Sequence, residues 1–176
     1  NRGKAACINR ALDLARGEFF LVMDSDDWCT DDALARFVAA WDSLGDSRSE
    51  YCGVSALKMY TDGRIVGEDY RRLIASGGTT YVDRFNAHVK GDKWEMLRTS
   101  IAREWRYELA SGERYQAPSY AWIGMGQHYR TLFINQPLGI VEYQADGISA
   151  RNIVHRAGSP LSAVTYYRRA MTVASG

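Results

Sequence analysis

The stretch Glu18–Asp32, E-F-F-L-V-M-D-S-D-D-W-C-T-D-D, decides the fold of this chain. Its apolar residues 19–23 run directly into the acidic loop Asp24–Asp27. A short, continuous apolar run bounded by turn residues predicts a strand buried on both faces, as in a parallel sheet covered by helices. The acidic loop then follows the carboxyl end of that strand, where ligands bind in open α/β sheets.

Asp24 and Asp26 form a D-x-D pair that indicates a metal and phosphate site. Two aspartates one residue apart can both reach one hard cation, which takes oxygen ligands and commonly shares them with substrate phosphates. The competing interpretation is an acidic turn that favours the N-terminus of the next helix. We assign Asp31 and Asp32 to that helix start, and Asp24 and Asp26 to chemistry.

The composition of the 176 residues is that of one soluble globular domain, with 46% hydrophobic and 24% charged residues. A net charge of +1, without blocks of basic residues, argues against nucleic acid as a partner. Three cysteines without C-x-x-C spacing favour a reducing compartment. Because no apolar run could span a bilayer and the chain shows no signal peptide, we expect no transmembrane segment. The expected location is the cytoplasm or the periphery of the cytoplasmic membrane.

Helical and strand patterns alternate around the acidic loop, which predicts an α/β fold. Apolar spacing predicts an amphipathic helix over residues 4–16, whose start Asn1 can cap. Gly3 and Lys4 place backbone N–H groups and a cation at the N-terminus of this helix, an arrangement that can receive a phosphate. A plain cap with a solvated lysine is the alternative. After Thr30, a second helix has its expected core positions at Leu34, Phe37, Val38 and Trp41.

The second half of the chain predicts further strands and helices. Tyr51–Tyr60 predicts a strand that returns through an Asp-Gly turn to Ile65 and Val66. Residues 79–85 predict another short strand. The remaining predictions are helices over 101–109 and 119–128, strands over 131–135 and 138–143 on either side of a Gln136–Pro137 turn, and a last helix from Pro160 with Leu161, Val164 and Met171 on its buried face.

Three segments together resemble the family 2 glycosyltransferases of the GT-A fold. They are N-R-G-K-A-A-C-I-N-R-A-L (residues 1–12), A-R-G-E-F-F-L-V-M-D-S-D-D (residues 15–27) and L-G-I-V-E-Y-Q-A-D-G-I-S (residues 138–149). Their order and spacing make the resemblance specific, since each would be weak alone. It implies a mixed, GT-A-like sheet flanked by helices, and one glycosyltransferase domain over residues 1–176.

The resemblance also implies a substrate and a site. The substrate would be a nucleotide-diphospho sugar bound with Mg²⁺ or Mn²⁺, and the acceptor would be a glycan, a lipid or a small molecule. The implied setting is bacterial cell-envelope polysaccharide synthesis. Asp24 would touch the ribose or the donor sugar, and Asp26 would bind the metal that bridges the diphosphate. The implied substrate-binding residues are Asn1, Gly3, Lys4, Asp24, Ser25 and Asp26.

Two departures from the family pattern limit this transfer of roles. Family members begin with strands that hold the base, so we expect this chain to be the C-terminal portion of a GT-A domain, incomplete at the N-terminus. The family also tends to show Pro-Glu, with the carboxylate as a base, where this chain has Pro118 and Ser119. Glu113 and Asp92 are the nearest candidate bases, although solvated surface carboxylates are the common alternative.

Two other functions remain open at this stage. An apolar strand ending in D-x-D also resembles haloacid-dehalogenase-type phosphatases, in which Asp24 would be the nucleophile. The later acidic pair of that family is matched only by Asp31 and Asp32, in the following helix. The second alternative is an inactive sugar- or nucleotide-binding remnant of the glycosyltransferase fold. For the transferase, Arg151, His155 and Arg156 could close over the diphosphate as a lid.

Overall fold

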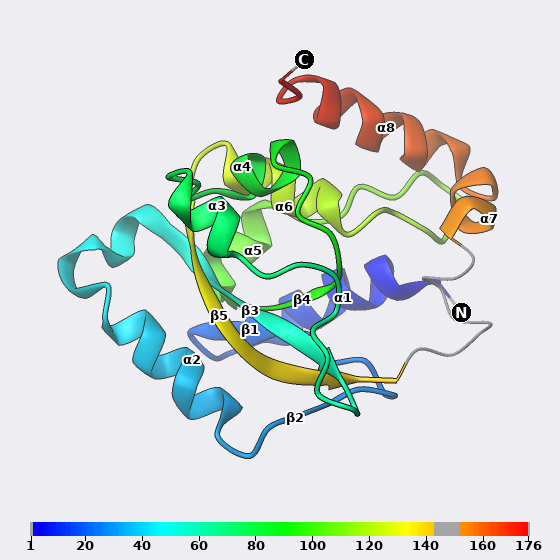
Figure 1. Ribbon diagram of the computed structural model, residues 1–176. Coiled ribbons are helices and arrows are strands. Elements are labelled where there is room, and N and C mark those ends of the chain that lie inside the picture. The colour runs from blue at the N-terminus through cyan, green and yellow to red at the C-terminus, as the bar shows by residue number, and fades with distance from the viewer. Residues whose placement is uncertain (1, 143–151, 176) are drawn as a thin grey trace.

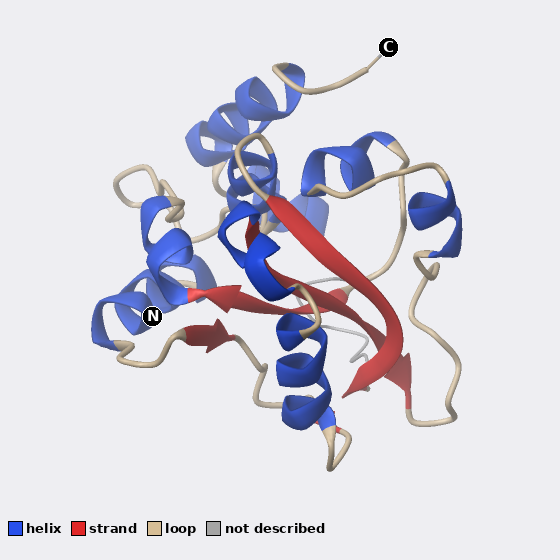
Figure 2. Ribbon diagram, turned by 90° about the vertical axis from the view of Figure 1, so that its left-hand side faces the viewer, coloured by secondary structure: helices blue, strands red, loops and turns tan. Residues whose placement is uncertain are grey.

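A five-stranded mixed sheet forms the centre of the computed structural model, which describes residues 2–142 and 152–175 (Figures 1 and 2). Across the sheet, the strand order is β1 (Phe19–Leu21), β4 (Lys93–Arg98), β3 (Tyr51–Tyr60), β5 (Arg130–Val141) and β2 (Trp28–Cys29). Only β3 and β5 pair in parallel, while the other three pairs of neighbours are antiparallel. The two shortest strands therefore lie at the two edges, and the chain between them crosses one end of the sheet.

Strand β1 confirms the position of the predicted strand but not its setting. It pairs antiparallel with β4 alone, its three residues are half-buried, and Met23 beyond it is 44% exposed. The prediction of a parallel strand buried on both faces was therefore wrong. The physical reason is that β4 supplies its neighbour, returning from far along the chain in the opposite direction.

Helix α2 (Ala33–Asp42) covers one face of the sheet. Its buried residues are Ala33, Phe37 and Trp41, and the Phe37 ring meets Trp94 of β4 edge to face at 5.2 Å between centroids. The predicted core positions Leu34 and Val38 were wrong, since they are 59% and 44% exposed. The buried stripe repeats every four residues and begins at a small residue, so the helix can approach the sheet closely.

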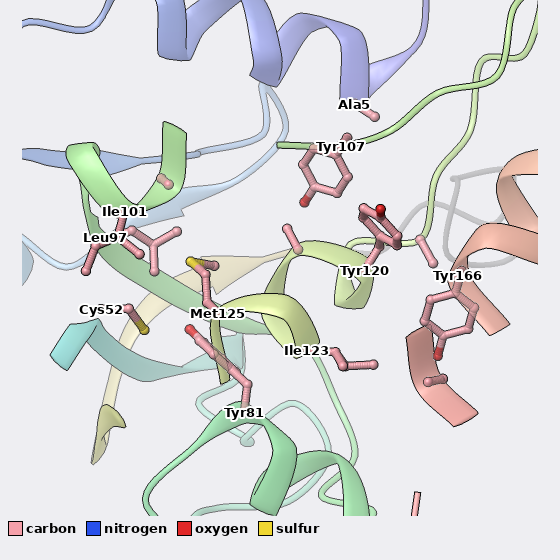
Figure 3. Close-up of a cluster of buried hydrophobic side chains, with 14 of the residues drawn as sticks. Ala5, Cys52, Tyr81, Leu97, Ile101, Tyr107, Tyr120, Ile123, Met125 and Tyr166 are labelled. Atoms are coloured by element: carbon pink, nitrogen blue, oxygen red, sulfur yellow. The ribbon is translucent and has the colours of Figure 1, made fainter. Parts of the chain in front are cut away.

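The opposite face carries a larger core, in which side chains of α4 (Tyr81–Asn86), α5 (Thr99–Glu104) and α6 (Ser119–Gly126) meet those of the sheet. Figure 3 shows Met125 near Leu97 and Ile101 in this cluster, with Ile123 on the side towards Tyr166. Helix α4 replaces the strand predicted over residues 79–85. The cause is a capping box at its start, where the Thr80 hydroxyl accepts from the Asp83 backbone N–H at 3.0 Å and Asp83 accepts from that of Thr80.

Strands β3 and β5 form the longest pairing of the sheet. The boundaries of β3 and its Asp-Gly turn confirm the prediction, with the Tyr60 N–H donating to the Arg64 carbonyl at 2.8 Å. The predicted turn at residues 136–137 was wrong, because β5 continues through it as one strand. Pro137 lies opposite Leu57 at a register irregularity, where a missing backbone N–H is tolerated.

The remaining helices are α1 (Lys4–Leu14), α3 (Arg71–Ala75), α7 (Asn152–Ala157) and α8 (Pro160–Met171), besides a 3₁₀ turn over Gly45–Glu50. Helix α8 begins at the predicted proline, but its buried residues are Ser162, Tyr166 and Ala170. The predicted face with Leu161, Val164 and Met171 is exposed. Among the described helices, none is long and apolar enough to cross a membrane.

Candidate functional site

The acidic loop forms a tight turn at the mouth of a large cleft. The Asp27 N–H donates to the Asp24 carbonyl at 3.1 Å, and all four residues of Asp24–Asp27 line the cleft, whose volume is about 1710 Å³. The cleft lies between the end of the sheet and the segments that lead into α6 and α8. The position of the loop follows from the sequence, because the apolar run becomes β1 and the polar turn stops it.

Lys4 and Asp24 lie together, as an ion pair with 2.5 Å between Nζ and Oδ2. Both side chains are about 40% exposed, so the pair is solvated and can exchange partners. Lys4 is the first residue of α1, and the positive end of the helix therefore faces the acidic loop. The structure thus joins two of the residues that the sequence proposed for substrate binding, although Asn1 lies outside the described residues.

Gly3 precedes α1 with a φ of +84°, a conformation that favours glycine. A Cβ atom at this position would lie 1.9 Å from the Arg114 carbonyl oxygen. Gly3 therefore allows the start of α1 to pack directly against the backbone of Arg114, which also lines the cleft. This contact gives Gly3 a structural role beside the predicted binding role.

Ser25 and Asp26 are exposed at the tip of the loop, and the Asp26 carboxylate has no ion pair in the described part of the chain. Asp27 instead pairs with Lys58 of β3, with 2.7 Å between Oδ2 and Nζ. The described residues contain no group of three or more His, Cys, Asp or Glu side chains that could hold a metal ion. A D-x-D pair nevertheless fits Mg²⁺ or Mn²⁺, which can take one or two carboxylates and complete their shell with phosphates and water. Among the described residues, no ion pair occupies the Asp26 carboxylate, as this role requires.

The two candidate bases from the sequence differ in their position. Glu113 does not line the cleft, and its two carboxylate oxygens accept from the backbone N–H groups of Leu161 and Ser162, at the start of α8, at 2.8 and 2.7 Å. Although desolvation opposes the change, hydrogen bonds from Ser162 and Leu161 lower the pKa of Glu113. Asp92 lines the cleft, as does Ser119 at the first turn of α6.

Glu95 of β4 is a cleft carboxylate that the sequence analysis missed. Its side chain is 11% exposed, and its Oε1 lies 3.6 Å from Arg84 Nη1 and accepts from the Ser55 hydroxyl at 3.3 Å. Burial raises the pKa of Glu95 above its usual range. The signal in the sequence was a carboxylate inside an apolar strand pattern, K-W-E-M-L-R, which is easily taken for a solvent-facing position.

The candidate lid residues His155 and Arg156 lie in α7 and line the cleft, whereas Arg151 is outside the described residues. The His155 ring stacks on Tyr115 at 5.7 Å between centroids. Arg156 Nη1 donates to the Tyr167 hydroxyl at 2.8 Å, which ties α7 to α8. Glu142, at the end of β5, also lines the cleft, but most of the E-Y-x-x-D-G-x-S segment lies outside the described residues.

Comparisons with known proteins agree with this architecture. Residues 1–106 match the family model described as glycosyl transferase family 2. In a search of curated proteins, no sequence matches the chain. Two structures of S. aureus TarS 1–349 are similar to it: one in complex with UDP-GlcNAc has a TM-score of 0.56 and 18% identity, and another has a TM-score of 0.54 and 17% identity.

A further S. aureus TarS structure has a TM-score of 0.54 and 16% identity. The matches cover 98%, 96% and 89% of this chain but 54%, 50% and 27% of the three structures. At such identities the likeness shows the fold alone. The chain thus spans about half, or less, of the length of the structures that it resembles.

Proposed function

The chain belongs to glycosyl transferase family 2, and from this premise we propose that it transfers a sugar from a nucleotide-diphospho sugar to a hydroxyl group of an acceptor. The observation that carries the proposal is the ion pair between Lys4 and Asp24 of the acidic loop. Both residues line one cleft and lie within the part of the chain that matches the family. A UDP-GlcNAc complex is known for the similar TarS structure, which supports a donor of this class. Bacterial cell-envelope polysaccharide synthesis remains the proposed setting.

The acidic loop would bind the donor. Asp24 would accept hydrogen bonds from the ribose or the donor sugar, and Lys4 would exchange its contact with Asp24 for a contact with the diphosphate. Gly3 and the positive end of α1 would face the same negative charge. Asp26 would hold Mg²⁺ or Mn²⁺, which supplies a positive charge that stabilises the leaving diphosphate.

The proposed reaction inverts the configuration at the anomeric carbon. A base takes the proton of the acceptor hydroxyl, whose oxygen then attacks from the face opposite the diphosphate. The cleft volume of about 1710 Å³ leaves room for both substrates, and its aromatic lining residues, such as Trp105, Tyr107 and Trp122, suit sugar rings. Of the two bases that the sequence suggested, only Asp92 lines the cleft.

The alternative phosphatase function has no support from the geometry. It needs a second acidic pair near Asp24, but Asp31 and Asp32 do not line the cleft. Asp32 instead accepts from Arg36 Nε at 2.6 Å at the start of α2. An inactive remnant of the fold differs from an enzyme only in turnover, and therefore needs an assay.

The test measures donor binding and turnover by the full-length protein. UDP-GlcNAc, UDP-glucose, UDP-galactose and GDP-mannose are each titrated with MnCl₂ in a calorimeter, and release of the nucleoside diphosphate is followed in water alone. We expect at least one donor to bind only with the metal and to be hydrolysed slowly. Binding without hydrolysis or transfer would indicate the remnant, and failure of nucleotide sugars to bind would contradict the proposal.

A further inference from the structure

Glu95 extends into the cleft from the face of β4 that contributes Leu97 to the larger core. Both of its close contacts, with Ser55 and with Arg84, are made by Oε1. No hydrogen bond to Oε2 is seen among the described residues. Glu95 is therefore anchored by one oxygen, while the other is available to a group in the cleft.

The register of the sheet places Glu95 close to the acidic loop. Leu21 of β1 lies opposite Met96 of β4, so Glu95 is one residue further along towards the loop, beside Val22. The Trp94 indole N–H donates to the Val22 carbonyl at 2.9 Å, which holds the segment after β1 against β4 beyond the paired residues of the two strands. Asp24 follows Val22 by two positions, which span at most about 7 Å of chain. This is close enough for one sugar ring to reach both side chains.

The other carboxylates of the cleft are held by different partners or sit at its rim. Asp24 pairs with Lys4, and Asp27 pairs with Lys58. Asp26, Asp92 and Glu142 are exposed. Glu95 is thus a carboxylate of the cleft floor, shielded from bulk water.

The charges around Glu95 suit a proton acceptor. Burial raises its pKa, while Arg84 of α4, Lys58 of β3 and the hydrogen bond from Ser55 oppose this rise, and Asp92 adds to it. The net effect is that the pKa of Glu95 is raised from its ordinary value towards neutral pH. A general base is most effective when its pKa lies near the working pH.

We propose that Glu95 is a catalytic base of this cleft, a role that rests on the proposed function. The Glu95 carboxylate takes the proton of the attacking O–H group, from the acceptor or from water. The oxygen forms a bond to the anomeric carbon as the bond from that carbon to the diphosphate oxygen breaks. The electron pair of the broken bond leaves with the nucleoside diphosphate, and Glu95 returns its proton to water.

The test compares Glu95→Gln with the parent in the full-length protein, using a nucleotide sugar that the parent hydrolyses with MnCl₂. We expect the rate of hydrolysis to fall by about 10²- to 10⁴-fold, with donor affinity unchanged within about twofold. Glu95→Asp should recover part of the rate. The acid limb of the parent pH–rate profile should be lost in Glu95→Gln. Glu104→Gln, on an exposed carboxylate of α5, is the control and should keep the parent rate.

Three outcomes would overturn this role. Hydrolysis by Glu95→Gln within threefold of the parent would show that another group takes the proton. An equal loss of donor affinity and rate, or a loss of the cooperative melt in both Glu95→Gln and Glu95→Asp, would show that Glu95 is structural. If the parent itself binds no donor, the proposed function fails first, and the two failures are thereby distinguished.

Discussion

Lys58 and Asp27 form an ion pair that fastens the acidic loop to strand β3, with 2.7 Å between Nζ and Oδ2 and each side chain only 13% exposed. The pair connects residues 31 positions apart. It also removes Asp27 from the carboxylates that could bind a cation. The acidic loop therefore offers a D-x-D pair to ligands and uses its third aspartate as an anchor.

We predict that Lys58→Met lowers the free energy of unfolding by about 3 kcal/mol, because it leaves the Asp27 carboxylate buried without a partner. The double variant Lys58→Met/Asp27→Asn should recover part of this loss. Urea unfolding measures both. The control is Arg64→Met, which breaks an exposed pair with Asp62; an equal loss in the control would contradict the prediction.

Asp26→Asn in the full-length protein should abolish metal-dependent binding of a nucleoside diphosphate, measured by calorimetry with Mn²⁺. The substitution keeps the size of the side chain but removes the charge that a hard cation needs. Asp24→Asn should weaken sugar-nucleotide binding and leave some metal-dependent affinity for the diphosphate. Asp31→Asn, outside the cleft, should behave as the parent does. Parental binding by Asp26→Asn would show that the acidic loop only starts the next helix.

Gly3→Ala should destabilise the protein more than Gly63→Ala does. Both glycines have a φ of +84°, but a Cβ atom meets the Arg114 carbonyl at Gly3 and nothing within 4 Å at Gly63. The shared backbone strain costs about 1 kcal/mol, and the overlap at Gly3 should add about 2 kcal/mol or more. Because the backbone strain is the same in both variants, the difference between their melting temperatures measures the cost of the overlap at Gly3. Equal melting temperatures would contradict this prediction.

Stability should rise with pH through the titration of Lys93. Its ammonium donates to the carbonyls of Val66 and Lys90 at 3.1 and 3.0 Å, and burial, with Arg84 nearby, lowers its pKa from 10.5 to about 8. Between these values the unfolded chain binds more protons than the folded one, so the free energy of unfolding rises with pH, by at most about 1.4 kcal/mol per unit.

Below pH 8 Lys93 is charged in both states, and the folded state bears the cost of the buried charge. Lys93→Met should therefore be compared with the parent by urea unfolding at several values between pH 7.5 and 10.5. The stability of the parent relative to this variant should increase across that window. Lys90→Met, on an exposed lysine, controls for the lost charge. A constant difference between the parent and Lys93→Met would contradict the prediction.

Glu113→Gln should lower the melting temperature at neutral pH and leave turnover intact, because Glu113 caps α8 rather than facing the cleft. The depressed pKa of Glu113 means that its charge stabilises the fold above the ordinary value of 4.5, and that this contribution is lost as pH falls through the folded-state pKa. Melts at pH 7 and 3 measure the effect. A loss of turnover with an unchanged melt would restore Glu113 as a candidate base.

The α/β class and the place of the acidic loop could be predicted, because both depend on local patterns. The apolar run before Asp24 stops at polar residues, and that boundary needs no distant partner. The neighbour of β1 could not be predicted, since β4 is supplied from beyond residue 90. The burial of Glu95 could not be predicted for the same reason, since its contacts with Ser55 and Arg84 come from two other elements.

Helix α8 shows a different limit of sequence patterns. Its apolar stripe predicted the buried face, yet Ser162 is buried because its hydroxyl accepts from the Ala110 N–H at 3.2 Å. A hydrogen bond can thus compensate for the burial of a polar residue. The capping box of α4, by contrast, was visible in the sequence as Thr80 followed by Asp83, and could have corrected the strand predicted there.

The acidic loop lies between the two shortest strands of the sheet, β1 and β2, which occupy opposite edges. Few backbone hydrogen bonds must break to release either end, whereas β3 is paired along both sides. Local opening of the loop should therefore cost much less than global unfolding, and amide hydrogens there should exchange far faster than those of β3. A ligand that binds both Asp24 and Asp26 would stabilise the acidic loop and slow the exchange of its amide hydrogens.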